Sequence, residues 1–226
     1  MFGRKIQNLI RLDKILYLKL KVSMKIAIIA ALNEEIKLFR KMESNKIYLA
    51  VCGVGKVNAA AKTQAVIDKF KPDLVIMVGV AAAADPKLKI GEVIVAKDLI
   101  QWDVDATAFS KHLPGQILFS QLRLFKAAEL FVKKLAKNSG VIVGRIVSGD
   151  TFVANKKLVK KIYRQFQAQA IDMESAALAQ VCQINQTPFL VIKAISDQAD
   201  GQAKVDFKKF LAKASQNNYD LVNRIL

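Results

Sequence analysis

Residues 171–200, IDMESAALAQVCQINQTPFLVIKAISDQAD, contain the pattern that decides the fold. The apolar run FLVIKAIS, residues 189–196, predicts a strand that is buried on both faces, because a strand with one solvated face would alternate polar and apolar residues. Such strands belong to parallel or mixed sheets that helices cover. Ligands bind at the carboxyl ends of the strands in these sheets, and Asp197 lies at such an end.

A second acidic residue, Glu174, is predicted to face the same rim of the sheet. The preceding residues AQAIDM indicate a short strand, and SAALAQVCQ, residues 175–183, favours a helix because Ala and Leu have high helix propensity. Met173 and Glu174 therefore fall in a tight junction between strand and helix. A carboxylate also stabilises the N-terminus of a helix through the helix dipole, so a purely structural role for Glu174 stays open.

Length and composition favour one domain over residues 24–226. The 226 residues are 53% hydrophobic, and the 4 Pro and 10 Gly mark no linker or repeat. Strands alternate with helices, which predicts an α/β fold, a three-layer α/β/α sandwich with a central mixed sheet. Residues 1–23 form a basic extension without a span of membrane length. They predict either an amphipathic helix that contacts a membrane or the domain, or a stretch upstream of a translation start at Met24.

The charges and the few reactive side chains narrow the class of function. The net charge of +17 makes nucleic acid a partner to consider, but the Lys residues are spread over predicted helix faces, which favours a solvated surface instead. Cys52 and Cys182 lie in apolar runs, as is typical of reduced thiols in a cytoplasmic protein. One His, His112, leaves little room for a His-based metal site or a Ser-His-Asp triad. We expect no metal and no cofactor, and carboxylates would carry any acid–base chemistry.

Two segments near the start of the domain add candidates. KIAIIAAL, residues 25–32, predicts a buried strand, and Glu34 and Glu35 follow in the first turn of a helix. The helix dipole alone could account for both, and a general base would occupy the same position. CGVGK, residues 52–56, lets the backbone approach a ligand closely but matches neither the P-loop nor the dinucleotide motif. We interpret it as a turn that borders a site without binding phosphate.

Six ordered motifs resemble one family from Met24 to the C-terminus. They are MKIAIIAALNEE, GVGKVNAA, DATAF, IVSGDTFV, IDMESAALAQVC and AISDQAD. Together they resemble the 5′-methylthioadenosine/S-adenosylhomocysteine nucleosidases of the nucleoside phosphorylase superfamily. The resemblance implies hydrolysis of the bond between adenine N9 and ribose C1′, with adenine and S-methyl-5-thioribose or S-ribosylhomocysteine as products.

The resemblance also implies roles for residues of these motifs. Glu35 matches the base that polarises the attacking water, and Asp197 matches the acid that protonates adenine N7, with Ser196 orienting its carboxyl group. Glu174 matches the residue that holds the ribose hydroxyls. Four more residues would bound the substrate: Phe152 stacked on adenine, the backbone of Val153 at the base edge, Met173 under the sugar and Phe207 against the purine.

The chemistry of glycosidic cleavage gives these residue types a physical reason. Positive charge develops on the ribose, so a carboxylate stabilises the transition state, while a protonated carboxyl group helps the base to leave. Asp197 must then stay protonated near neutral pH, and Glu35 must stay ionised. Asn33, Glu34 and Glu35 occupy the turn where related phosphorylases carry Arg residues and hydroxyls, and acidic groups repel phosphate. Water is therefore the expected nucleophile.

Three features depart from the family pattern. The turn GVAAA, residues 79–83, lacks the usual Ser, and Val80 is among its residues. Lys193 replaces a usual Arg, although its charge can still neutralise Glu35. The stretch between Glu35 and Gly53 is too short for a strand hairpin that is common in the family.

A further segment, DVDATAF at residues 103–109, resembles one that lies at the homodimer interface in the family. Phe109 would then cover the 5′-thio group of a substrate bound in the partner subunit. An ordinary buried aromatic residue is the alternative.

Two other functions stay open. A sister specificity, for 5′-deoxyadenosine or 6-amino-6-deoxyfutalosine, would keep the same three carboxylates. A degenerate protein that binds adenine nucleosides without cleaving them is conceivable because of Val80, Lys193 and the missing hairpin. A small nucleoside is the expected partner in each case.

Overall fold

A computed structural model describes residues 24–109, 111–200 and 203–226 of the chain. The extension predicted for residues 1–23, and any contact it would make with a membrane, lies outside the described residues. Among the residues that are described, no helix has both the length and the apolar character needed to cross a membrane.

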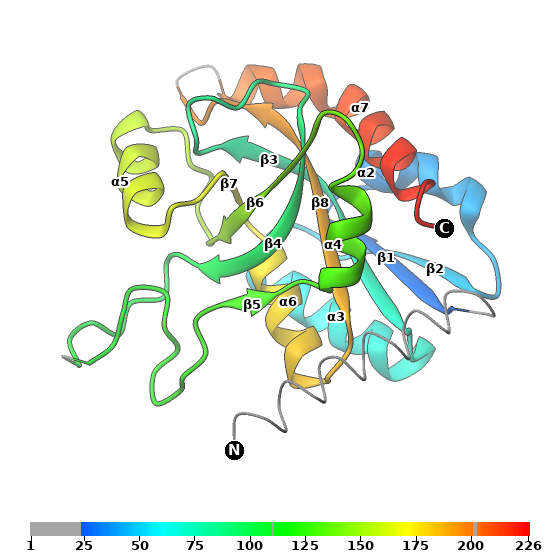
Figure 1. Ribbon diagram of the computed structural model, residues 1–226, viewed down its shortest axis with the longest axis horizontal. Helices are drawn as coiled ribbons and strands as arrows, with labels where there is room; N and C mark the ends of the chain where they lie inside the picture. The colour runs from blue at the N-terminus through cyan, green and yellow to red at the C-terminus, as the bar shows by residue number, and fades with distance from the viewer. Residues whose placement is uncertain (1–23, 110, 201–202) are drawn as a thin grey trace.

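The centre of the described structure is an eight-stranded mixed sheet (Figure 1). Its first strand, β1 (Ile26–Ala30), lies between β2 (Ile47–Val51) and β3 (Leu74–Ala83) and is parallel to both. All five residues of β1 are buried, because both faces of the strand carry apolar side chains.

The rest of the sheet closes on itself. β3 pairs with β7, β7 with β6, β6 with β4, β4 with β8, and β8 returns to β3. The pairs β3–β7 and β4–β8 are antiparallel, whereas the other pairs of the ring are parallel. A short strand, β5, extends the sheet beside β4. The bounds of these strands are β4 Val93–Gln101, β5 Phe125–Lys126, β6 Val141–Ser148, β7 Ala170–Asp172 and β8 Phe189–Asp197.

Helices cover the sheet on both sides (Figure 1). α2 and α7 pack on β3 and β8, whereas α3 and α6 pack against each other on the other face. The predicted α/β architecture with a mixed central sheet is thus confirmed, and the closure of the ring is an additional feature. The bounds are α2 Asn33–Ile36, a 3-10 helix Lys37–Met42, α3 Lys56–Phe70, α4 Glu129–Leu135, α5 Lys156–Phe166, α6 Ser175–Ile184 and α7 Ala203–Val222.

One predicted element differs in the structure. The segment LFKAAELFVKKLAK, residues 124–137, has the pattern of one helix, but only Glu129–Leu135 is α-helical. Phe125 is buried and pairs with Leu99 of β4, so the residues before the helix form a strand. Tertiary pairing here outweighs the local helix propensity.

An ion pair stabilises the ring of strands where β4 pairs with β6. Arg145 of β6 binds Asp98 of β4, with Nη2 and Oδ2 3.1 Å apart, and both side chains are mostly buried. Nη1 of Arg145 also donates to the carbonyl of Phe166 at the end of α5, at 2.7 Å. This guanidinium therefore joins two strands and one helix.

Candidate active site

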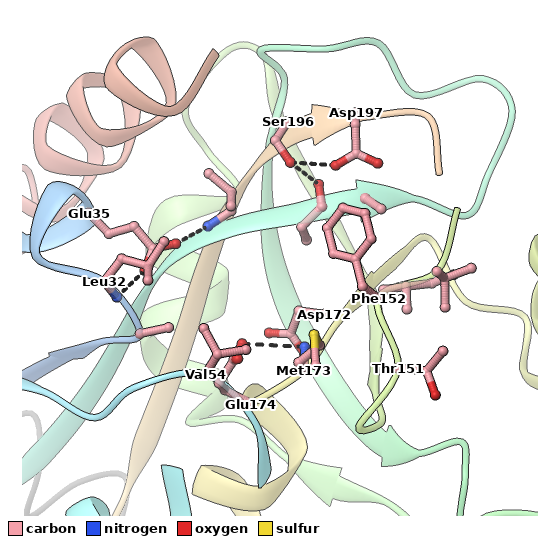
Figure 2. A pocket seen from close by; sticks show the side chains of 16 residues that line it. Leu32, Glu35, Val54, Thr151, Phe152, Asp172, Met173, Glu174, Ser196 and Asp197 are labelled. Atoms are coloured by element: carbon pink, nitrogen blue, oxygen red, sulfur yellow. Dashed lines mark hydrogen bonds between the residues drawn. The ribbon is translucent and has the colours of Figure 1, made fainter. Parts of the chain in front are cut away.

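A cavity of about 290 Å³ lies where the carboxyl ends of β1, β3 and β8 meet the junction between β7 and α6 (Figure 2). Its wall is mostly apolar, but four carboxylates from three regions of the sequence reach it. Such a cavity of low polarity with a few convergent polar groups is typical of a small-molecule site. The residues that line it are Ala31, Leu32, Glu35, Val54, Val80, Ala81, Ala82, Thr151, Phe152, Val153, Ile171, Asp172, Met173, Glu174, Ser196 and Asp197.

Glu35 lies at one side of the cavity, in the single turn of α2. Its Oε2 accepts a hydrogen bond from the backbone N–H of Leu32, and its Oε1 accepts one from Val80, both at 2.9 Å. Burial raises the pKa of this carboxyl, while the charge of Lys193 and the backbone hydrogen bonds oppose the rise. The group is held rigidly and is a better proton acceptor than an exposed carboxylate.

Gly79 makes the position of Glu35 sterically possible. Its φ is +150°, and a Cβ built on it would lie 2.5 Å from Oε1 of Glu35 and 3.2 Å from Nζ of Lys193. Real Cβ atoms do not approach an oxygen so closely, so any side chain at this position would displace the carboxylate. The bare glycine thus leaves room for an anion and a cation side by side.

Glu174 lies on the floor of the cavity, immediately before α6 (Figure 2). Its Oε1 accepts a hydrogen bond from the backbone N–H of Gly55 at 2.9 Å, so the Gly-rich turn binds a carboxylate of the chain itself. Burial raises the pKa of Glu174 to about 7, with the charges of Asp172 and Glu35 adding to the rise and Lys193 opposing it.

Asp197 lies on the side of the cavity opposite Glu35, at the end of β8 (Figure 2). Its side chain is almost fully buried. Oδ1 accepts a hydrogen bond from the backbone N–H of Ala199 at 2.8 Å, and Oδ2 lies 2.7 Å from Oγ of Ser196. Ser196 and Asp197 therefore form one unit at this end of the cavity.

Most residues singled out in the sequence come together at this cavity. Phe152 lies near Asp197, Met173 lies beside Glu174 (Figure 2), and Val153 also lines the cavity. Lys193 is buried just behind the wall, and Phe109 lies outside the cavity of its own chain with half of its surface exposed. Phe207 belongs to α7, but its side chain is outside the described part of the chain.

One acidic residue of the cavity was not singled out from the sequence. Asp172 lines the cavity and forms an ion pair with Lys193, with 3.0 Å between Oδ2 and Nζ. The two residues are 21 positions apart and lie on strands that do not pair with each other, so no local pattern joins them. The only signal was the adjacency of Asp172 to Met173 and Glu174 in the motif DMES.

Comparisons with known proteins agree with this geometry. A profile of the Phosphorylase superfamily matches residues 31–226. The 5′-methylthioadenosine/S-adenosylhomocysteine nucleosidase of Staphylococcus haemolyticus (strain JCSC1435) is 39% identical over 199 residues, which are 84% of this chain and 86% of the relative. The chain therefore belongs to the Phosphorylase superfamily.

Solved structures show where the chain belongs within the superfamily. The 5′-methylthioadenosine/S-adenosylhomocysteine nucleosidase of Neisseria meningitidis, in complex with methylthio-immucillin-A, has a TM-score of 0.82 at 35% identity, covering 88% of this chain and 97% of that one. Futalosine hydrolase of Helicobacter pylori strain 26695 has a TM-score of 0.83 at 30% identity, covering 91% and 98%. Within the superfamily the chain belongs with the 5′-methylthioadenosine/S-adenosylhomocysteine nucleosidases. The predicted family and the predicted enzyme class, an N-glycosyl hydrolase, are confirmed.

The raised pKa of Glu174 predicts a pH-dependent loss of stability that Glu174→Gln removes. A carboxyl group with a pKa of 4.5 when unfolded and about 7 when folded contributes stability below pH 4.5 and loses it as the pH rises through 7. Between pH 5 and pH 8 we expect the free energy of unfolding to fall by about 2 kcal/mol more in the wild type than in the variant. Urea denaturation at the two pH values measures this, and equal falls in both proteins would contradict the assignment.

Proposed function

We propose that this protein hydrolyses the N-glycosidic bond of 5′-methylthioadenosine and S-adenosylhomocysteine. The products are adenine and S-methyl-5-thioribose or S-ribosylhomocysteine. The relatives named for this activity and the arrangement of carboxylates in the cavity both support the proposal. A nucleosidase with two free thiols, Cys52 and Cys182, also suits a reducing cytoplasm.

The observation that carries the proposal is the separation of Glu35 and Asp197 across one apolar cavity (Figure 2). Cleavage of a nucleoside by water needs a proton acceptor on the ribose side and a proton donor on the base side. An adenosine placed between the two carboxyl groups meets both needs, with Phe152 and Val153 at the base end.

Glu35 acts as the base in this proposal. Each of its oxygens accepts one backbone hydrogen bond, and each retains a lone pair that can accept a proton from water. The oxygen of that water forms a bond to C1′, and the proton it loses passes to Glu35. Burial raises the pKa of Glu35, which makes its carboxylate a stronger base than an exposed one.

Asp197 acts as the acid. The bond from C1′ to N9 breaks with its electron pair moving to adenine, and the carboxyl proton of Asp197 passes to adenine N7. Ser196 fixes the orientation of the carboxyl group, because its hydroxyl donates to Oδ2 of Asp197 at 2.7 Å and its Oγ lies 3.5 Å from the carbonyl oxygen of Ala81. Burial of Asp197 favours the neutral form of the carboxyl group, which has a proton to give.

Glu174 binds the ribose hydroxyls and opposes the positive charge that grows on the sugar. Met173, next to it on the cavity floor, packs under the ribose. Water is preferred to phosphate as the nucleophile, because Glu35 and Glu174 line the cavity on the ribose side and repel an anion.

The 5′ substituent is the least determined part of the substrate. The Helicobacter pylori futalosine hydrolase resembles this chain about as closely in fold as the Neisseria meningitidis 5′-methylthioadenosine/S-adenosylhomocysteine nucleosidase does. A specificity for 6-amino-6-deoxyfutalosine or 5′-deoxyadenosine is therefore the second candidate, with the same three carboxylates and the same chemistry.

We further propose that the active form is a homodimer. The connection between β4 and β5 extends away from the sheet (Figure 1) and carries exposed apolar side chains, with Phe109 50%, Leu113 57% and Phe119 83% exposed. The rings of Phe109 and Phe119 contact each other, with centroids 5.7 Å apart. A second copy of the chain would cover this surface, and Phe109 would reach the 5′ end of the substrate in the partner.

Purified protein should release adenine from 5′-methylthioadenosine in phosphate-free buffer. A panel of adenosines that differ at the 5′ position, assayed by chromatography of free adenine, ranks the substrates. A strict requirement for added phosphate would refute hydrolysis. Tight binding of every nucleoside with no adenine release would instead favour a binding protein without catalytic activity.

Asp197→Asn should lower kcat by about two orders of magnitude or more and change KM little, because the amide cannot donate the proton but keeps the shape of the side chain. Steady-state kinetics with methylthioadenosine measure the effect, and thermal melting with adenine confirms that the cavity still binds the base. Turnover close to that of the wild type would remove Asp197 from the mechanism.

Phe109→Asp should convert the dimer to a monomer and raise KM, because a charge in an apolar interface is costly to bury. Light scattering after size-exclusion chromatography gives the mass, and activity is assayed on the same fractions. Ile184→Asp, which changes an exposed apolar residue at the end of α6, is the matched control and should stay dimeric. A fully active monomer of the wild type would refute the shared pocket.

A further inference from the structure

We infer that Asp172 is a positioning residue of this site, whose task is to hold the Lys193 cation between Glu35 and Glu174 while leaving both glutamates free for substrate. The inference rests on the proposed function for its catalytic meaning. It deepens that function by adding a fourth carboxylate with a different task from the other three.

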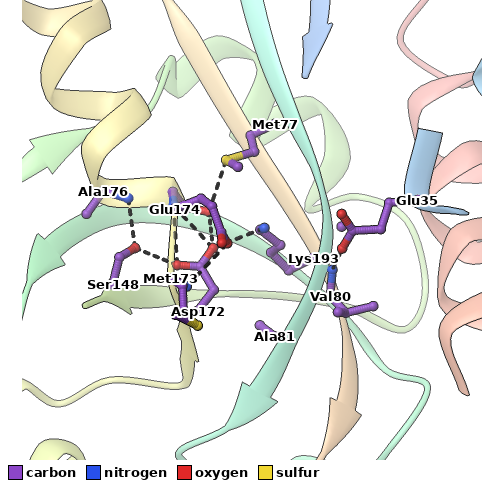
Figure 3. Close-up of polar contacts among 12 residues, drawn as sticks. Glu35, Met77, Val80, Ala81, Ser148, Asp172, Met173, Glu174, Ala176 and Lys193 are labelled. Carbon is purple, nitrogen blue, oxygen red and sulfur yellow. Dashed lines mark hydrogen bonds and ion pairs between the residues drawn. The ribbon is translucent and has the colours of Figure 1, made fainter. Parts of the chain in front are cut away.

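Lys193 is an unusual residue for its location. It lies in the middle of β8, with 1% of its surface exposed, opposite Gly79 of β3 and Ile94 of β4. A buried ammonium group is stable only if an anion and hydrogen-bond acceptors compensate for its lost hydration. Nζ lies 3.0 Å from Oδ2 of Asp172, and the two side chains are 1% and 2% exposed (Figure 3).

Asp172 is itself fixed by donors on both oxygens. Oδ1 accepts a hydrogen bond from Oγ of Ser148, and Oδ2 accepts one from Oγ of Ser175, whose backbone N–H also points to both oxygens at 3.3 Å. Oγ of Ser148 accepts a hydrogen bond from the backbone N–H of Ala176 at 2.8 Å, which leaves the hydroxyl proton for Asp172 (Figure 3). These donors fix the orientation of the Asp172 carboxyl group, with Oδ2 directed at Nζ of Lys193.

The pairing is selective among three nearby anions. Within the described residues, Lys193 forms its ion pair with Asp172, although Glu35 and Glu174 also attract it. Glu35 is instead satisfied by backbone N–H groups at Leu32 and Val80, and Glu174 by Gly55. Lys193 therefore influences both glutamates through its field without occupying their oxygens.

Removal of Asp172 and removal of Lys193 should have opposite effects on the pKa of the nearby glutamates. The charge of Asp172 raises the pKa of Glu174, whereas the charge of Lys193 lowers it. Without Asp172, Lys193 has only Glu35 and Glu174 as counter-ions and is drawn into direct ion pairs that block water and ribose. Without Lys193, burial and mutual repulsion favour protonation of both glutamates.

Other titratable groups lie close to the ion pair of Asp172 and Lys193. Burial raises the pKa of the Cys52 thiol to about 12, and the charges of Glu174, Lys193 and Glu35 also act on it. Cys52 therefore stays neutral below that pH. The titratable groups that interact with the pair are Glu35 on α2, Cys52 after β2 and Glu174 before α6, while Asp197 at the end of β8 lines the same cavity.

The test compares the pH dependence of kcat/KM in Asp172→Asn and Lys193→Met. We expect each change to lower kcat by about tenfold or more, as for other losses of positioning. The acidic limb of the profile reports ionisation of the glutamates in the site. It should move to lower pH in Asp172→Asn and to higher pH in Lys193→Met. Lys193→Arg keeps the cation and should leave the limb where it is in the wild type.

Asp98→Asn is the matched control. It makes the same substitution in another ion pair, which is mostly buried, with Arg145, away from the cavity. It should lower stability and leave the acidic limb unmoved. If Asp172→Asn behaves like this control, or if its limb moves in the same direction as that of Lys193→Met, Asp172 is only structural and the inference is refuted.

A measurement without substrate separates this inference from the proposed function. In NMR spectra of protein labelled with ¹³C at the Glu carboxyl, the signal that is lost in Glu174→Gln identifies Glu174. The pH midpoint of its titration should fall in Asp172→Asn and rise in Lys193→Met. The double variant removes Asp172 and Lys193 together, so neither is left as a buried charge without its partner, and the protein remains testable where a single variant does not fold. Its midpoint should lie between those two. Absence of adenine release by the wild type would refute the function alone, whereas an unmoved Glu174 signal would refute the inference alone.

Discussion

A buried positive charge is stable only beside a negative charge, and the ion pair between Lys193 and Asp172 determines how the other carboxylates of the cavity are arranged. Four carboxylates line one apolar cavity, and unscreened repulsion between them would favour protonation. The ammonium group of Lys193, fully enclosed by β3, β4 and β8, offsets part of that repulsion. Its direct pairing with Asp172 leaves the oxygens of Glu35 and Glu174 turned towards backbone donors and the cavity.

The backbone supplies the remaining constraints, and small residues make them possible. Gly79 leaves the space in which Glu35 and Lys193 lie near each other, and Gly55 presents its N–H to Glu174. Ala82 of β3 pairs with Ile171 of β7 on one side and with Asp197 of β8 on the other. That double pairing brings Glu174 and Asp197 to one cavity, although β7 runs antiparallel to β3.

The sequence predicted much of this from local patterns. The apolar run of residues 189–196 predicted a doubly buried strand with Asp197 at its end, and the structure has β8 there. The junction at Met173 and Glu174 was predicted from a short strand followed by a helix of high propensity, and β7 and α6 agree. The helical pattern of residues 124–137 was wrong for residues 124–128, because the pairing of Phe125 with Leu99 depends on a strand 26 positions earlier.

The sequence by itself therefore determined the class of fold, the rim of the sheet at which the cavity lies and three of the four acidic residues that line it, because buried strands and helix starts leave local periodicities. Only the tertiary structure decided the closure of the sheet into a ring, the room beside Gly79 and the choice of Asp172 as the partner of Lys193. Which anion neutralises a buried cation depends on distances across several strands, and no spacing along the chain records those distances.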